Sequence, residues 1–99
     1  MGSRLNQRRL EDVQRQLSHA RESLKVLEEQ VLVWNDALED TRIRALVSET
    51  PQQTHEYDEL SRHVQAANAE MLRRTNDVRE LIEARDELLR NWKPKDDHE

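Results

Sequence analysis

The sequence predicts an all-α protein: an antiparallel two-helix coiled-coil hairpin, expected to dimerise into an elongated four-helix bundle. Apolar residues recur at alternating spacings of three and four along two long stretches. One strong break, at Thr50-Pro51, separates the two stretches. The composition is 34% hydrophobic and 37% charged, with one Gly and no Phe. That composition suits long amphipathic helices better than a compact globule.

We expect a single hairpin over residues 1–99. The first helix should cover about 4–48, the turn about 48–50 and the second helix about 51–92, followed by a disordered tail over 93–99. The first apolar stripe begins at Leu10, and the residues between its members are mostly charged or polar. The weaker periodicity of residues 5–9 leaves their order open. The first stripe, or seam, consists of Leu10, Val13, Leu17, Ala20, Leu24, Leu27, Val31, Trp34, Leu38, Thr41 and Ala45.

The break carries the signals of a helix start. The Thr50 hydroxyl can accept a hydrogen bond from a free N–H of the next turn, and Pro51 suits the first helical position. Gln53 stands three residues after Thr50, which completes a capping-box pattern. The sequence therefore predicts that one helix ends near Ser48 and the next begins at Pro51.

The second stripe repeats the spacing of the first, but Arg occupies two of its positions. Arg74 and Arg85 have carboxylates within about a turn, at Glu70, Asp77 and Glu83. We expect these guanidinium groups to fix register or oligomeric state; an anion-binding role in the bundle core is the alternative. The second seam consists of Tyr57, Leu60, Val64, Ala67, Met71, Arg74, Val78, Leu81, Arg85, Leu88 and Trp92.

A turn of two or three residues makes the helices antiparallel. If the turn is centred near Glu49, the numbers of facing seam residues total about 98. Leu27 would then face Met71, and Trp34 would face Val64. A register totalling about 105 would require a longer loop centred beyond Pro51, which the capping signals disfavour.

Apolar side chains outside the seams predict a second contact surface. They are Val26, Val33, Ala37, Ile43, Leu46 and Val47 in the first helix and Ile82 and Leu89 in the second. One helix pair buries only one side of each helix, so the simplest use of the remaining apolar surface is a homodimer. The interface candidates are Ile43, Leu46, Val47, Glu49, Tyr57, Ile82 and Leu89.

The residues that could carry chemistry do not form a recognisable catalytic motif. The chain has no Cys, and we predict no catalytic, cofactor-binding or metal site. His55, Glu59 and His63 share one helical face, but they flank the seam and more simply form a solvated polar face. The pairs Asp40–Arg44, Glu70–Arg74 and Asp86–Arg90 have the spacing of ordinary helix ion pairs.

The distribution of charge along the chain indicates which kinds of partner the protein can bind. Residues 1–25 carry six basic and three acidic side chains, whereas residues 26–60 carry two and nine, and the whole chain has a net charge of −5. Direct nucleic-acid binding is disfavoured because an acidic chain repels phosphate. No apolar run is long enough for a membrane span, and the expected location is the cytoplasm.

We therefore expect a non-enzymatic protein-interaction module, a self-associating scaffold or adaptor. The alternative is a regulator whose acidic tip docks on a basic partner, such as a transcription or nucleic-acid-processing complex. A small helical enzyme or a metal-binding bundle is a remote third possibility.

Overall fold

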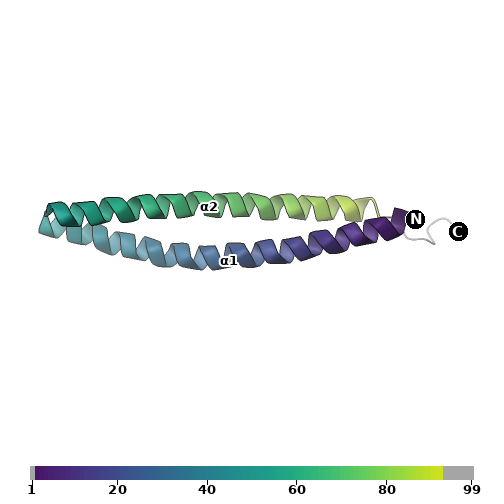
Figure 1. Ribbon diagram of the computed structural model, residues 1–99, viewed down its shortest axis with the longest axis horizontal. Coiled ribbons are helices and arrows are strands. Elements are labelled where there is room, and N and C mark those ends of the chain that lie inside the picture. The colour runs from purple at the N-terminus through teal and green to yellow at the C-terminus, as the bar shows by residue number, and fades with distance from the viewer. Residues whose placement is uncertain (1, 93–99) are drawn as a thin grey trace. The chain divides into compact units, whose positions relative to one another are not determined.

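The computed structural model describes residues 2–92, with side chains from Arg4 onward. Helix α1 spans Gly2–Ser48 and helix α2 spans Pro51–Arg90 (Figure 1). The described residues contain no strand, so the predicted all-α helical hairpin is confirmed. Helix α1 includes residues 5–9, and α2 ends two residues before the expected position 92. The expected tail over 93–99 lies outside the described residues.

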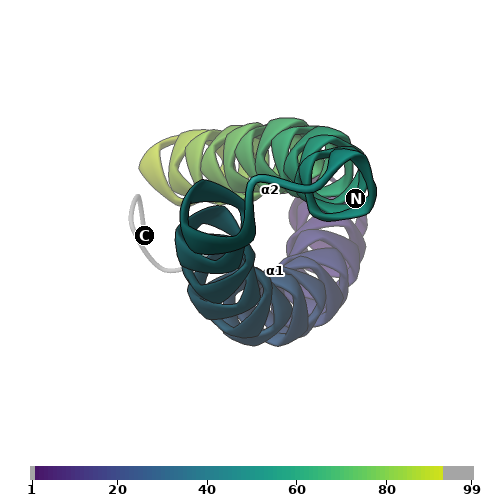
Figure 2. The same cartoon turned by 90° about the vertical axis from the view of Figure 1, so that its left-hand side faces the viewer.

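The connection between the helices consists of Glu49 and Thr50 (Figure 2). Glu49 has a φ of 54°, in the left-handed region, and its N–H donates to the carbonyl oxygen of Ala45 at 3.1 Å. This bond satisfies one of the free carbonyls at the end of α1, in the manner of a left-handed helix cap. Such caps usually use Gly, because a side chain at positive φ costs about 1–2 kcal/mol.

Thr50 caps the start of α2 as predicted. Its Oγ1 accepts a hydrogen bond from the N–H of Gln53 at 3.2 Å, and Pro51 is the first residue of the helix. The second hydrogen bond of the predicted capping box, from the Thr50 N–H back to the Gln53 side chain, is wrong, however. The side-chain carbonyl oxygen of Gln53 is buried without a hydrogen-bond partner among the described residues. The helix start is therefore held by the Thr50 cap and by the fixed φ of Pro51.

Contacts divide the described chain into two units, and each contains a segment of both helices. In the unit Leu24–Arg73, the core cluster consists of Leu27, Val31 and Ala67, with Trp34 and Met71 packed against it. In the unit formed by 2–23 and 74–92, Leu17 is the most deeply buried side chain, at 2% exposure. The structure leaves every predicted seam position either buried or half-buried.

Two contacts between the helices report their register, one in each unit. The rings of Trp34 and His63 meet edge to face with centroids 4.4 Å apart, and Arg74 donates to Ser23. In both pairs the two residue numbers total 97, close to the expected 98 and far from 105. The short turn therefore sets the register that its capping signals predict.

Thr41 is a buried polar residue in the seam, at 8% exposure. Its hydroxyl donates to the carbonyl oxygen of Ala37, one turn earlier, at 2.8 Å. This local bond satisfies the hydroxyl without a partner from α2. Thr41 is therefore accommodated at an apolar position by its own helix.

Candidate protein-interaction surface

The apolar side chains that the seam leaves in solvent gather mainly on α1 within the unit Leu24–Arg73. We call Val26, Leu32, Val33 and Ile43 the outer face of α1. Their exposures are 44%, 67%, 65% and 48%. Val26 and Val33 are seven residues apart and Leu32 and Ile43 are eleven apart, so each pair lies on one side of the helix.

A second exposed group lies at the end of α1, beside the turn. We call Leu46, Val47 and Glu49 the tip. Leu46 is 65% exposed, Val47 is 79% exposed, and Glu49 is exposed as well. The left-handed cap at Glu49 ends the helix here, so these side chains stand at the terminus of a rigid element.

The other interface candidates do not join these two groups. Tyr57 is half-buried at its seam position, and Ile82 is half-buried on α2 in the unit of 2–23 and 74–92. Leu89 belongs to that second unit as well and is 51% exposed. The structure therefore brings together only the candidates on α1.

Three exposed apolar residues were not predicted from the sequence: Leu5, Leu32 and Leu72, at 52%, 67% and 63% exposure. Leu32 directly follows the seam residue Val31, and Leu72 directly follows Met71. Because Val31 and Met71 occupy seam positions, the 3–4 pattern places Leu32 and Leu72 outside the seam. Checking each apolar residue against that pattern would have identified them.

The tip borders a surface hollow of about 610 Å³, formed by the end of α1 and the first turns of α2. Nearly all of its lining residues are exposed, whereas pockets for small molecules enclose most of the ligand. The hollow therefore lacks the enclosure that a small-molecule site requires. It is lined by Ala45, Leu46, Glu49, Thr50, Pro51, Thr54, His55 and Asp58.

The three residues considered as metal ligands have separate contacts. His55 Nε2 lies 2.7 Å from Glu59 Oε1, and both side chains are largely exposed. His63 instead packs its ring against Trp34. Within residues 2–92, no group of three or more His, Cys, Asp or Glu side chains is placed to hold a metal ion. His63 therefore contributes to packing between the helices.

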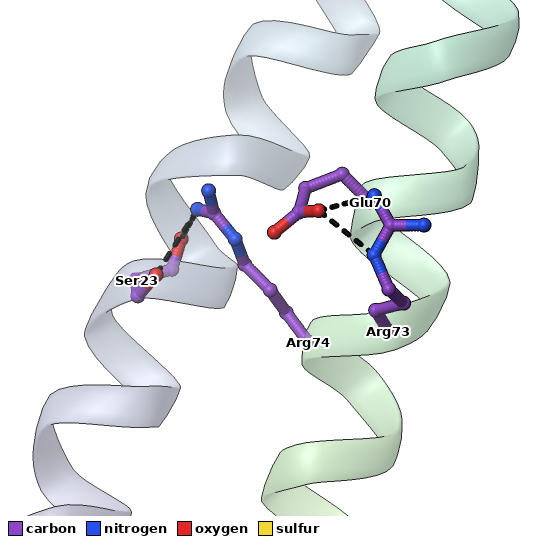
Figure 3. Close-up of polar contacts among 4 residues, drawn as sticks. All are labelled: Ser23, Glu70, Arg73 and Arg74. Carbon is purple, nitrogen blue, oxygen red and sulfur yellow. Dashed lines mark hydrogen bonds and ion pairs between the residues drawn. The ribbon is translucent and has the colours of Figure 1, made fainter.

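The two arginines of the second seam make contacts within the chain. Arg74 is half-buried and reaches from α2 to α1, where its Nη1 donates to Ser23 Oγ at 3.0 Å and to the Ser23 carbonyl oxygen at 3.3 Å (Figure 3). Arg85 donates from Nε to Oδ1 of the neighbouring Asp86 at 3.2 Å. The Arg74 contact joins the two helices directly and so supports their register.

Four ion pairs within the described helices have a spacing of three residues. They join Asp12 to Arg15, Glu39 to Arg42, Glu70 to Arg73 and Glu87 to Arg90. Figure 3 includes the pair on α2 between Glu70 and Arg73, with Oε1 and Nε 3.0 Å apart. Exposed pairs of this kind contribute little to stability.

Two of the ion pairs predicted at a spacing of four are wrong. Arg90 pairs with Glu87 rather than Asp86, and Asp40 has no ion-pair partner among residues 2–92. A long Arg side chain can reach a carboxylate three or four residues away, and the spacing alone does not choose between them. Asp40 therefore keeps an exposed charge on the α1 segment of its unit.

The Glu39–Arg42 pair perturbs both pKa values. The hydrogen bond from Arg42 lowers the pKa of the Glu39 carboxyl below its ordinary value of 4.5. The same bond raises the pKa of Arg42. Both groups are exposed, so the pair is a local surface feature.

Comparisons with protein-family models, curated proteins and solved structures found no match to this chain. The described helices contain no stretch long and apolar enough to cross a membrane.

Proposed function

We propose that this chain is a non-enzymatic protein-interaction module that self-associates through the outer face of α1 to form a four-helix scaffold or adaptor. The observation that carries the proposal is the outer face itself: four large aliphatic side chains, 44–67% exposed, on one segment of one helix. Single exposed apolar residues are common on proteins, but clusters on one face mark interaction sites. We propose the cytoplasm as its location.

The hairpin has a physical reason to associate. Within residues 2–92, the buried apolar side chains are few: Leu17, Leu27, Val31, Val64 and Ala67. Covering the exposed part of each outer-face side chain would gain about 1 kcal/mol. Association costs at least about 4 kcal/mol in lost freedom, so both copies must contribute their outer faces. We therefore expect a dimer that dissociates on dilution.

A matched pair of substitutions tests this function. Leu32 and Leu72 are 67% and 63% exposed, but only Leu32 belongs to the outer face. Leu32→Asp should convert the dimer to a monomer while helicity is retained, because a carboxylate would be buried at the interface. Leu72→Asp should leave the dimer intact. Sedimentation velocity measures both masses; equal behaviour of the two variants would contradict the proposal.

The tip supports a second candidate function, docking on a basic partner such as a transcription or nucleic-acid-processing complex. Two exposed apolar side chains, Leu46 and Val47, stand beside Glu49 and the hollow. Apolar anchors with a charged rim are common at protein interfaces. Leu46→Asp combined with Val47→Asp should then abolish capture of a basic partner without changing helicity or dimer mass. Loss of helicity would show that these residues are structural.

A further inference from the structure

The side of α1 that faces away from the seam is both apolar and acidic within the unit Leu24–Arg73. In the heptad pattern, the positions one, two and five residues after Leu24, Val31 and Leu38 lie on this side. Four of these nine positions hold the aliphatic residues of the outer face, four hold carboxylates and one holds Lys25. All nine side chains are exposed. The carboxylates belong to Glu29, Asp36, Glu39 and Asp40.

The carboxylates are interleaved with the aliphatic side chains. Asp36 and Asp40 stand between the first three aliphatic residues of the outer face and the last one, Ile43. Any partner that covers these aliphatic side chains must therefore come close to both carboxylates. Glu39 already pairs with an arginine of its own helix, whereas Asp36 and Asp40 have no ion-pair partner within residues 2–92. Both therefore bring an uncompensated negative charge to the interface.

A second copy brings the same carboxylates to the interface in either orientation. In a parallel pair of outer faces, each carboxylate lies beside its own counterpart. In an antiparallel pair that covers all four aliphatic side chains, Val26 lies against Ile43. Asp40 then falls opposite Glu29, and Asp36 falls within one turn of its own counterpart. Like charges that meet at an interface disfavour association, and the single lysine of each face is outnumbered.

We propose that Asp36 and Asp40 regulate self-association by charge: their repulsion keeps the dimer weak at low ionic strength, and the dimer tightens when they are screened or neutralised. The inference rests on the proposed self-association and adds its regulation. The aliphatic side chains of the outer face supply the attraction between the copies. The carboxylates set the ionic conditions under which that attraction exceeds the cost of association.

Removal of the two charges tests this regulation. Asp36→Asn with Asp40→Asn should tighten the dimer about tenfold at ~150 mM salt, because two repelling carboxylates are lost from each copy. The matched control is Glu56→Gln with Asp58→Asn, which removes two exposed carboxylates from α2 of the same unit. The Debye length at this salt is about 8 Å, so charges outside the outer face should hardly affect the Kd of the dimer. Sedimentation velocity over a range of concentrations gives each Kd, and circular dichroism checks that every variant stays helical.

The response to salt provides an independent readout. Raising the salt from about 10 mM to about 150 mM shortens the Debye length from about 30 Å to about 8 Å. The unmodified dimer should therefore tighten several-fold over this range, and the variant without the two carboxylates should tighten less. A general strengthening of apolar contacts by salt would affect both chains equally. The difference between the two chains therefore reports the two carboxylates.

The outcomes separate the two proposals. A tighter dimer in the variant of Asp36 and Asp40 alone, with a reduced response to salt, supports regulation by charge. A dimer that is unchanged or weaker in that variant, that tightens equally in the control, or that keeps the full response to salt overturns the regulation but not self-association. A monomer mass for every variant at every concentration overturns both.

Discussion

Replacing Leu27 by Ala tests whether the buried stripe of α1 holds the hairpin together. Leu27 is 6% exposed and belongs to the core cluster with Val31 and Ala67. Burying a leucine side chain is worth about 1.5–3 kcal/mol, and the cavity left by truncation adds to the loss. A two-helix core can relax around a cavity, so we expect a loss of about 2–3 kcal/mol. For a chain of this length, that corresponds to a fall in Tm of about 10–20 °C.

The matched control is Leu72→Ala, the same substitution at a side chain that is 63% exposed. Most of this side chain is already in water, so its truncation should cost at most about 1 kcal/mol. Urea unfolding followed by circular dichroism gives both values. All samples need the same protein concentration, because association stabilises the folded state. Equal costs, or a larger cost at Leu72, would refute the assignment of the seam.

Three further predictions follow from individual contacts. Glu49→Gly should raise the free energy of unfolding by about 0.5–1 kcal/mol. Gly removes the cost of the positive φ at this position, and its more flexible unfolded state offsets part of that gain. If urea unfolding shows that the variant is less stable, the backbone at Glu49 is not strained. Thr41→Val should be neutral or stabilising by up to about 1 kcal/mol, since the lost hydroxyl bonds only to Ala37 and the new methyl group is apolar. A large loss of stability in the same assay would show that the hydroxyl has another role. The Glu39 carboxyl should titrate below 4.5 by NMR, and Arg42→Gln should raise its pKa toward 4.5. Because the pKa of Glu39 is lowered in the folded state, the stabilisation by the Glu39–Arg42 pair is complete above pH 4.5 and is lost as the pH falls through the folded-state pKa. An unchanged Glu39 pKa in the Arg42→Gln variant would exclude Arg42 as the cause of the shift.

The arrangement of the helices could be predicted because the determining signals are local and repeated. The 3–4 spacing specifies which side of each helix is buried, and an error at one position does not alter the pattern. Thr50 and Pro51 specify where α2 begins, since both residue types favour a helix start. These signals together also indicate the register that the Trp34–His63 contact reports.

The contacts that could not be predicted are those for which alternative conformations or partners have similar energies. Glu49 adopts a left-handed conformation although no Gly marks the position, because the short connection requires positive φ there. Arg74 reaches across to α1 and donates to Ser23, a residue outside the seam that the 3–4 spacing does not mark. Arg90 selects a carboxylate three residues away rather than four, a choice that depends on side-chain rotamers.

The candidate interaction surface was only partly predictable. The seam pattern separates Val33 and Ile43 from the buried stripe, but it does not show which exposed residues belong to the same unit. The structure places Ile82 and Leu89 in a different unit from the outer face and adds Leu32 to that face.

The mass of the unmodified chain in solution tests the central proposal most directly. Light scattering on a sizing column, over a wide range of concentrations, measures it without a label or a substitution. Self-association through the outer face predicts a mass approaching twice 11.8 kDa as the concentration rises. A folded, helical chain that keeps the mass of a monomer at every concentration would contradict that proposal and would leave the outer face to a different partner.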